Sequence, residues 1–330
     1  MQRKIGLTYD LRSEYLGLGF KEEDVAEFDS DVTIDAIEQT IRELGHIPDR
    51  IGHARTLCRR LVAGDRWDLV FNIAEGLHGR NREAQVPCLL DMYDVPYSFS
   101  DPLVCAVTLD KAVAKRIVQS SQLHTPRFHV VKDETDLRDV DLAYPLFAKP
   151  IAEGTGKGID KTSRVESPSQ LRELCLTLLK RYGQPVLVEE FLPGREFTVG
   201  ILGTGAQARI LGTMEVCIRQ NAETTIYTYE VKEKCDDFVD YHRPERTPAV
   251  EAVERLALGS YRALELRDGG RVDIRMDRFG EPAFMEINPL PGLNPQHSDL
   301  PYIARQEGLS YRQLIGSILD SALERLAPST

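Results

Sequence analysis

The chain has 330 residues, of which 42% are hydrophobic and 28% are charged, and its formal net charge is −11. Single cores rarely grow beyond about 250–300 residues, so this length predicts two or three domains. The negative charge argues against nucleic acid or an anionic membrane as a partner, and no apolar stretch approaches the roughly 18 residues of a membrane span.

The first hundred residues alternate between strand and helix patterns. Residues 4–9 predict a strand rather than a signal peptide, and a long polar loop follows through Asp29. Ser30 is expected to cap a helix that ends at Gly45. The apolar residues at helical spacing in it are Ile34, Ile37, Ile41 and Leu44. With a second strand at 67–73, this order predicts a parallel α/β layer.

Beyond residue 102, short strands alternate with helices. We expect helices over about 105–121, from Pro168 to about Leu178, and from Pro248 to about Tyr261. The expected strands span 128–131, 144–149, 186–189, 196–202 and 209–216. The sequence therefore predicts three α/β or α+β units in series.

An acidic segment that reads RVDIRMDRFGEPAFMEIN carries the most informative pattern. Its first half alternates between charged and apolar residues, which predicts a half-buried strand. A turn centred on residues 279–280 would return the chain as the second strand of a hairpin. This register places Asp273 opposite Glu286 and Arg271 opposite Asn288.

Two carboxylates and an amide that face each other across a hairpin destabilise the pairing unless something lies between them. Mg²⁺ prefers oxygen ligands and usually bridges protein carboxylates to substrate phosphates, and arginine binds phosphoryl oxygens. Asp273, Glu286 and Asn288 are therefore candidate metal ligands. The alternative is a solvated strand face whose acids pair with Arg275 and with lysines.

A glycine-rich loop at 153–158 follows the expected strand that ends near Lys149. Glycines at alternate positions let the backbone approach a ligand and present N–H groups to phosphate oxygens. The spacing fits neither a Walker A loop nor a dinucleotide fingerprint. A flexible hairpin would explain the glycines alone, but Lys149 before the loop and Lys157 within it indicate a phosphate site.

In this order, the segments resemble the D-alanine–D-alanine ligase family of ATP-grasp enzymes, over about residues 67–322. The segments that carry the resemblance are 71–79 (ending in a His-Gly pair), 108–111, 147–150 with the glycine-rich loop, 188–199, 270–273, 285–288, 291–292 and 304–310. The resemblance implies an α/β (α+β) fold with a three-domain ATP-grasp architecture. Its parts would be an N-terminal parallel-sheet domain over 1–102 and two lobes, 103–184 and 185–330, that clamp ATP.

The resemblance also implies ATP and two Mg²⁺ ions as cofactors, with Mn²⁺ as an alternative metal. The implied ATP ligands are Lys111, Lys149, Gly154, Thr155, Gly156, Gly158, Glu189, Glu190, Phe191, Leu192, Glu196 and Lys232. Lys111 and Lys149 would hold the α- and β-phosphates, and Lys232 the γ-phosphate. Glu189 and the backbone after it would read the adenine, and Glu196 the ribose. The implied metal ligands are Asp273, Glu286 and Asn288.

The implied reaction joins two amino acids through an acyl phosphate and releases ADP and phosphate. The implied catalytic residues are Arg271, Gly292, His78 and Lys232, and the implied substrate-binding residues are His297, Ser298, Asn288 and Gly292. Arg271 and the Gly292 N–H would stabilise the tetrahedral oxyanion. His78 also fits a buried structural histidine, and Glu196 an ordinary surface glutamate.

The chain departs from the family around the first substrate. In the family, a glutamate of the first loop holds the first D-alanine and bonds to a serine of the glycine-rich loop and to a tyrosine. Here the acids of the first loop align with no single candidate among Glu14, Glu22, Glu23 and Glu27. Thr155 and Gly156 occupy the serine positions, and Glu233 occupies the tyrosine position. The first-substrate pocket is therefore expected to be rebuilt.

Two other functions stay open: an ATP-grasp ligase for other amino acids outside cell-wall synthesis, and a non-catalytic nucleotide-binding module. The presence of Arg271, Asp273, Glu286 and Asn288 argues against the second. The expected partners are small-molecule amino acids, and a homodimer is one assembly left open. The six cysteines are scattered without a CxxC pair, which indicates reduced, partly buried thiols and a cytoplasmic protein.

Overall fold

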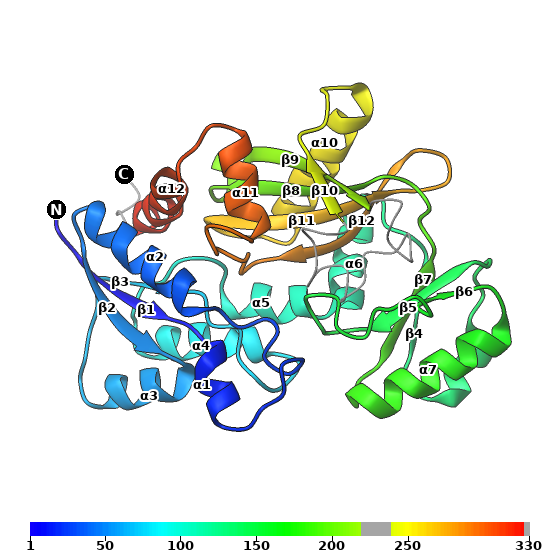
Figure 1. Cartoon of the computed structure of the whole chain (residues 1–330), viewed down its shortest axis with the longest axis horizontal. Coiled ribbons are helices and arrows are strands. Elements are labelled where there is room, and N and C mark those ends of the chain that lie inside the picture. Colours follow the sequence, from blue (N-terminus) through cyan, green and yellow to red (C-terminus); the bar gives the residue numbers. More distant parts are fainter. Residues whose placement is uncertain (219–238, 327–330) are drawn as a thin grey trace.

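The computed structural model describes residues 1–218 and 239–326, and their strands form three sheets. The strands are β1 (Lys4–Thr8), β2 (Ile47–Gly52), β3 (Leu69–Asn72), β4 (Phe128–Val131), β5 (Leu146–Pro150), β6 (Arg164–Val165), β7 (Val186–Glu190), β8 (Glu196–Leu202), β9 (Arg209–Ile218), β10 (Val239–His242), β11 (Gly269–Met276) and β12 (Pro282–Asn288). The sheets have the orders β2-β1-β3, β4-β7-β5-β6 and β10-β9-β8-β11-β12. The first and second of these sheets lie at opposite ends of the molecule (Figure 1).

Helices cover the faces of these sheets. They are α1 (Arg12–Gly17), α2 (Asp31–Glu43), α3 (Ala54–Val62), α4 (Gln85–Met92), α5 (Pro102–Leu109), α6 (Lys111–Ser120), α7 (Pro168–Tyr182), α10 (Pro248–Ala263), α11 (Asp299–Gln306) and α12 (Tyr311–Glu324). No helix in the described ranges is both long and apolar enough to cross a membrane.

The N-terminal sheet is parallel, as the strand and helix patterns predicted. The Ser30 side chain accepts a hydrogen bond from the Thr33 N–H at the start of α2, and Gly45 after its end has a positive φ of 86°. The polar loop predicted through Asp29 contains the short helix α1, which was not predicted. Strand β2 and helix α3 were not predicted. The pattern of β2 is weak, because the strand lies at a sheet edge and only Ile51 in it is buried.

The expected helix over 105–121 is in fact two helices, α5 and α6. Asp110 separates them with an extended backbone, at φ −84° and ψ 97°. Its side chain accepts hydrogen bonds from the N–H groups of Ala112 and Val113, which caps α6. The break makes Lys111 the first residue of α6, so the start of this helix fixes the position of the lysine backbone.

The four-stranded sheet is antiparallel and packs against α7. Ser167 caps this helix, Pro168 starts it, and Gly183 ends it in the left-handed conformation, at φ 62°. Leu171, Leu174 and Leu178 of α7 are buried against the sheet, as their spacing predicted.

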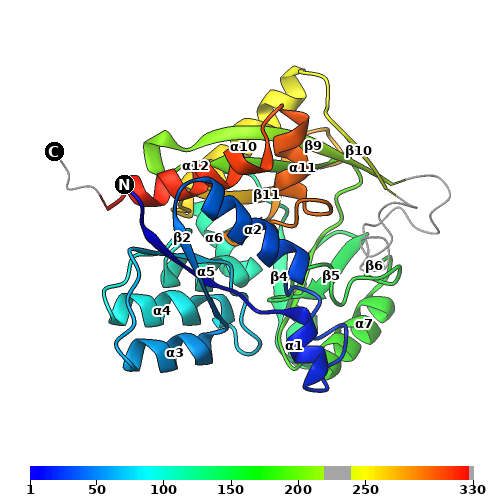
Figure 2. The ribbon, with the colours of Figure 1, turned by 60° about the vertical axis from the view of Figure 1, so that its left-hand side comes forward.

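The five-stranded sheet carries the acidic hairpin, formed by β11 and β12. Helices α10 and α6 cover one of its faces, and α11 packs on β9 and β8 (Figure 2). The predicted register is confirmed: Asp273 pairs with Glu286 and Arg271 with Asn288. A bulge follows, because Ile274 pairs with Phe284 and Met285 has no opposite residue.

One hydrophobic core joins the two ends of the chain. Residues of β1, β3 and α2 pack in the same buried cluster as residues of α11 and α12. Ile34, Ile37 and Ile41 of α2 are each at most 1% exposed, and so are Ile315 and Ile318 of α12. The N-terminal sheet and the C-terminal helices are therefore held together as one packed unit.

Candidate active site

The polar face of the β11–β12 hairpin brings together the residues that the sequence singled out there. Asp273 accepts hydrogen bonds from Thr198 Oγ1 at 3.0 Å and from Arg271 Nη2 at 3.1 Å. Arg271 also pairs with Asp299, at the start of α11. Asn288 Nδ2 lies 3.5 Å from the same Asp273 carboxylate. The hairpin therefore gathers carboxylate and amide oxygens on one partly buried surface.

Lys111 connects this hairpin to the glycine-rich loop. Its Nζ donates to the Glu153 carbonyl oxygen at 2.6 Å and lies 3.6 Å from Glu286 Oε2. Its backbone N–H donates to the carbonyl oxygen of Ile151. The side chain is only 8% exposed, so its charge lies at the bottom of the space between the loop and the hairpin.

A cleft lies between the glycine-rich loop and the hairpin. It is lined by Lys111, Phe147, Lys149, Pro150, Glu153, Gly156, Lys157, Ile159, Glu196, Asp273, Arg275, Met285 and Glu286. In the loop, Thr155, Gly156 and Gly158 have positive φ values of 47°, 74° and 73°. At Gly158 a Cβ would lie 2.6 Å from the Pro150 ring, so only glycine fits there. The cleft thus combines loop backbone, lysines and acids.

Behind the cleft, Glu189 lies between two buried lysines. Lys115 Nζ and Lys149 Nζ are each 3.0 Å from one of its carboxylate oxygens. Burial raises the pKa of Glu189, but the two cations outweigh burial and hold this pKa below its usual value. Glu189 was predicted to read an adenine amino group, and in this structure its carboxylate is already paired with the lysines.

Lys115 is a residue that the sequence analysis missed. Its side chain is fully buried and also donates to Thr125 Oγ1 and to the Phe284 carbonyl oxygen, both at 3.0 Å. Burial lowers its pKa to about 8, against the opposing effect of Glu189. Its position four residues after Lys111, on the inner face of α6, is the signal that could have identified it.

The segment after β7 leads from the four-stranded to the five-stranded sheet. The N–H groups of Glu190 and Phe191 donate to backbone carbonyl oxygens, and Leu192 is buried. The guanidinium groups of Arg164 and Arg275 both lie over the Phe191 ring, with their Cζ atoms 4.6 and 5.6 Å from its centroid.

Glu196, at the start of β8, lines the cleft, and its side chain is 14% exposed. Its carboxylate lies 3.2 Å from Arg275 Nη1.

Glu27 is the acid of the first loop that reaches the glycine-rich loop. Its Oε1 accepts a hydrogen bond from the Gly154 N–H at 2.6 Å, and a Cβ at Gly154 would lie 2.3 Å from it. Arg82 Nη2 donates to the same carboxylate at 2.9 Å, and Lys157 Nζ lies at 3.7 Å. Arg82 also donates to the Ala152 carbonyl oxygen. Glu27 and Arg82 together therefore hold the loop from its outer side.

The sequence left Glu27 as one of four candidates and did not single out Arg82. Burial raises the pKa of Glu27, but Arg82 and Lys157 outweigh burial and lower it. The charge of the Glu27 carboxylate is therefore already balanced by cations of this chain.

His78 is exposed and lies apart from the hairpin residues. It lines a cavity of about 600 Å³ on the outer side of the glycine-rich loop, with Phe20, Glu27, Arg82 and Lys157 among its neighbours. Its ring centroid is 6.5 Å from that of Phe20. The alternative of a buried structural histidine is therefore wrong.

The segment after β12 places Gly292 against Ser298. A Cβ at Gly292 would lie 2.7 Å from Ser298 Oγ, which accepts a hydrogen bond from the Asn294 N–H. His297 is exposed, and its backbone N–H donates to Asn294 Oδ1. Ser298 is also the residue before α11, the helix that begins with Asp299, the partner of Arg271. This segment therefore borders the hairpin.

Lys232 and Glu233, both named from the sequence, lie outside the described residues. Within 1–218 and 239–326, no group of three or more His, Cys, Asp or Glu side chains forms a metal site by itself. Asp273, Glu286 and Asn288 are not such a group, because one of the three is an asparagine. A Mg²⁺ site of this kind is completed by oxygens of the substrate phosphates and of water.

Comparison with known proteins assigns the chain to a family. Residues 117–320 match the family model described as "D-ala D-ala ligase C-terminus". The chain is 32% identical to a D-alanine–D-alanine ligase of Aquifex aeolicus over 286 aligned residues. The aligned stretch covers 86% of this chain and 92% of the relative. It is 37% identical over 272 residues to the D-alanine–D-alanine ligase of Bordetella pertussis, with 81% and 82% covered. An uncharacterised Sinorhizobium fredii protein, y4sG, is 35% identical over 264 residues, with 78% and 75% covered.

Solved structures share the whole fold. A D-alanine–D-alanine ligase of Bacillus anthracis, complexed with ATP, superposes with a TM-score of 0.74 at 20% identity and covers 98% of both chains. VanG, a D-Ala:D-Ser ligase of Enterococcus faecalis, gives 0.74 at 19% identity, with 98% of this chain and 100% of that chain covered. Fold and site together define the class of this protein as an ATP-grasp ligase. The chain belongs to the D-alanine–D-alanine ligase family.

Proposed function

We propose that this protein uses ATP to join two amino acids, as D-alanine–D-alanine ligases do, and releases ADP and phosphate. The observation that carries the proposal is the cleft in which Lys111, Lys149 and the glycine-rich loop face Asp273 and Glu286. Buried cations beside loop backbone fit phosphate oxygens, and acids opposite them fit the counter-ions of a polyphosphate. This arrangement supports binding of ATP with its phosphates against the hairpin.

Within this cleft we assign the ATP contacts from the residues upward. Lys111 and Lys149 neutralise the inner phosphates, and the backbone around Gly154, Thr155, Gly156 and Gly158 covers them. The segment Glu190, Phe191 and Leu192 lies beside the adenine, with Glu189 behind it, and Glu196 lies beside the ribose. Because Glu189 is already paired with lysines, its assigned part is to hold Lys149 in place.

The hairpin residues fit Mg²⁺ by their chemistry. Asp273 and Glu286 supply carboxylate oxygens, Asn288 supplies an amide oxygen, and all three come from paired positions of two strands. We assign two Mg²⁺ ions to them, with Mn²⁺ as a substitute. When bound, these ions neutralise phosphate charge and orient the terminal phosphoryl group.

The proposed reaction has two steps. A carboxylate oxygen of the first amino acid attacks the γ-phosphorus, the bond to the bridging oxygen breaks, and ADP leaves with that electron pair. The unprotonated amine of the second amino acid then attacks the acyl carbon of the acyl phosphate. Phosphate leaves with the former carboxylate oxygen, and the amine loses its remaining extra proton to solvent. We assign Arg271 and the Gly292 N–H to stabilise the oxyanion of this second step.

For the amino acids themselves, we assign Ser298 with His297 to the carboxylate of the second. His78, which faces the cavity on the outer side of the glycine-rich loop, keeps a proposed catalytic role. We assign Asn288 and Gly292 to substrate binding as well. Lys232, with a proposed γ-phosphate contact, completes the set. D-alanine is the first candidate for both substrates, because the chain belongs to a family named for it.

A second candidate is a ligase for other amino acids, favoured by one observation. Glu27, the first-loop acid beside the glycine-rich loop, is already neutralised by Arg82 and Lys157. A carboxylate in that state attracts a substrate ammonium less strongly than a free one does. The first subsite would then prefer a substrate other than D-alanine or accept a broader range.

A screen of phosphate release across pairs of D- and L-amino acids tests both candidates. D-alanine with D-alanine as the fastest pair supports the first, and a different fastest pair supports the second. If no pair of amino acids leads to ATP turnover, the proposed function is wrong.

Three further assignments accompany this function. We propose the domain division 1–102, 103–184 and 185–330, with the qualification that β7, at Val186–Glu190, pairs in the sheet of the central part. We propose a cytoplasmic location, supported by the five free cysteines of the described residues, of which Cys105 and Cys175 are buried. A homodimer is proposed as the assembly to test.

A further inference from the structure

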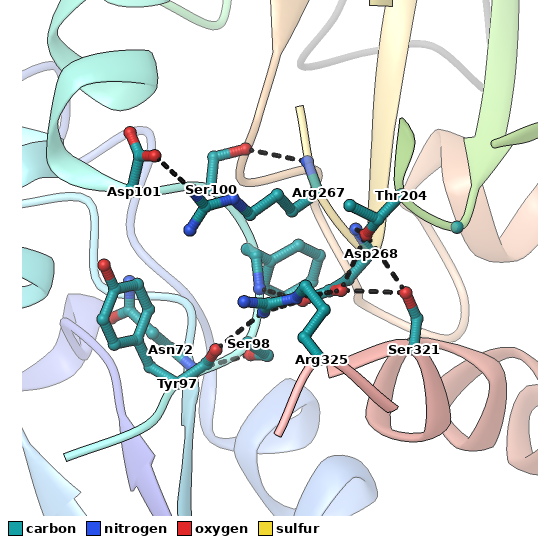
Figure 3. Close-up of polar contacts among 12 residues, drawn as sticks. Asn72, Tyr97, Ser98, Ser100, Asp101, Thr204, Arg267, Asp268, Ser321 and Arg325 are labelled. Atoms are coloured by element: carbon teal, nitrogen blue, oxygen red, sulfur yellow. Dashed lines mark hydrogen bonds and ion pairs between the residues drawn. The ribbon is translucent and has the colours of Figure 1, made fainter. Parts of the chain in front are cut away.

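Asp268, the residue before β11, lies completely buried where four chain segments meet (Figure 3). Within the described part of the chain, its two carboxylate oxygens accept five hydrogen bonds of 2.6–3.1 Å. The donors are the Phe99 N–H, Thr204 Oγ1, Ser321 Oγ, and Nε and Nη2 of Arg325. Because both oxygens of this buried carboxylate have hydrogen-bond donors, the carboxylate fixes the chain segments that supply those donors.

The backbone of Asp268 is held as well as its side chain. It has a positive φ of 64°, in the left-handed region that few non-glycine residues other than asparagine and aspartate adopt. Its N–H donates to Thr204 Oγ1 and its carbonyl oxygen accepts from the Gly203 N–H, both at 2.9 Å. The chain therefore enters β11 in one direction, set by the turn that follows β8.

Arg325, the ionic partner of Asp268, extends the junction to the N-terminal sheet. Its Nη2 also donates to the Tyr97 carbonyl oxygen at 2.9 Å. The next residue in that segment, Ser98, accepts a hydrogen bond from the Asn72 N–H at the end of β3. Figure 3 shows Arg325 between Tyr97 and Asp268, with Asn72 and Ser98 beside Tyr97. The junction thus joins β3, α12 and the start of β11.

The position of this junction matters because β11 carries the reacting face of the hairpin. Arg271 and Asp273 follow Asp268 by three and five residues on a strand that is paired on both sides. A strand held at the residue that precedes it transmits a rotation or shift of that residue to the side chains beyond it. We propose that Asp268 is a positioning residue, which fixes Arg271 and Asp273 relative to the N-terminal sheet.

A purely structural role would make a different prediction. If Asp268 only stabilised the fold, its replacement would lower the melting temperature and leave turnover of the folded enzyme unchanged. A positioning role lowers kcat of the folded enzyme, because displacement of reacting groups by about 1 Å is costly, while the KM for ATP stays nearly constant.

The test replaces Asp268 by asparagine, which keeps the shape and tolerates a positive φ but loses the charge that Arg325 binds. Well below the melting temperature of the variant, we expect kcat to fall about tenfold and the KM for ATP to change less than about threefold. Arg325→Lys, which keeps the charge, should lose less activity than Arg325→Met. The two changes D268N and R325M together should be no worse than the more severe single change.

Asp101→Asn is the matched control. It removes the neighbouring pair between Asp101 and Arg267, whose side chains are 25% and 34% exposed, but keeps a residue able to cap α5. Its kcat should stay within about twofold of the parent. A folded Asp268→Asn with unchanged kcat would overturn the proposal. If Asp268→Asn does not fold, Arg325→Met and Ser321→Ala decide by the same criterion.

The inference rests on the proposed function, so a readout without turnover accompanies it. Hydrogen exchange across residues 269–276 should be faster in Asp268→Asn than in Asp101→Asn. Equal exchange in the two variants contradicts the anchoring of β11. Absence of turnover in the parent enzyme, with faster exchange in Asp268→Asn, contradicts the proposed function alone.

Discussion

Asp273 of β11 and Glu286 of β12 lie directly opposite each other in the antiparallel register, with a bulge immediately beyond them. Paired carboxylates at this position would repel each other, and nearby cations offset this. Arg271 contacts Asp273, and Lys111 lies 3.6 Å from Glu286. The proposed function explains the pair as a site for Mg²⁺, and this explanation leads to the first prediction.

Replacing Glu286 by glutamine should reduce turnover by at least about 10²-fold, roughly 3 kcal/mol of transition-state stabilisation, because one carboxylate ligand is lost. The variant should fold, since an acid facing Asp273 becomes neutral. Steady-state ADP formation at saturating Mg²⁺ measures the effect. Glu281→Gln, an exposed change in the turn of the same hairpin, serves as the control. Near-normal ADP formation by Glu286→Gln would rule out the metal assignment.

Lys149→Ala should weaken ATP binding. The lysine is buried at the strand end before the glycine-rich loop and is paired with Glu189. The parent protein should gain about 2.7 kcal/mol of stability from ATP·Mg²⁺ at a hundred times its dissociation constant, and the variant should gain much less. Thermal unfolding with and without nucleotide measures this. Lys161→Ala, an exposed change shortly after the loop, should keep the full gain. An equal nucleotide-induced shift in Lys149→Ala would refute the phosphate contact.

Lys115→Met should destabilise the protein by about 2–4 kcal/mol, because Glu189 would keep only one of its two cations in a buried position. The Phe284 carbonyl oxygen would still accept from Thr125 Oγ1, at 2.8 Å, so the loss comes mainly from the unbalanced charge. Urea unfolding provides the measurement, and Lys132→Met at an exposed position is the control. A loss below about 0.5 kcal/mol would show that Lys149 alone balances Glu189.

Stability should depend on pH through Glu83. Burial raises its pKa to about 7, Arg82 and Lys111 oppose this, and Glu27 adds to it. In the unfolded chain this carboxyl has its ordinary pKa of 4.5, so between about 4.5 and 7 the folded state binds more protons. The contribution of Glu83 to stability is therefore present below about 4.5 and falls as the pH rises through this window.

Glu83→Gln should abolish this fall. Relative to the parent, the variant should gain on the order of 1–3 kcal/mol on going from pH 4.5 to pH 8. Urea unfolding at both pH values gives the difference, and Glu173→Gln, an exposed change on α7, should show the pH profile of the parent. A parallel profile for Glu83→Gln would mean that the pKa of this carboxyl is the same in the folded and the unfolded chain.

Much of the fold followed from local patterns. The register of the hairpin was predictable because alternation and turn chemistry fix which side chains share a face. Ser30, Pro168 and Pro248 marked helix starts correctly, because a capping side chain or a proline at the first position acts on its own helix. Strand β2 was not predicted because its edge position leaves most of its side chains at least partly exposed.

Contacts between distant segments were harder to foresee. Arg82 holds the glycine-rich loop through Ala152, 70 residues away, and Lys115 contacts Phe284 at a separation of 169 residues. Periodicity carries no information about such pairs. The choice of Glu27 among the first-loop acids likewise required the loop to be folded against Gly154.

The central claim is that the terminal phosphate of ATP is transferred to a substrate carboxylate. The most direct measurement supplies the best first substrate of the amino-acid screen with ¹⁸O in its carboxylate and follows the label by mass spectrometry. We predict one ¹⁸O atom in the released inorganic phosphate for each dipeptide formed, because the carboxylate oxygen that attacks the phosphorus leaves with it. Phosphate without ¹⁸O, or AMP with pyrophosphate as products, would contradict this account.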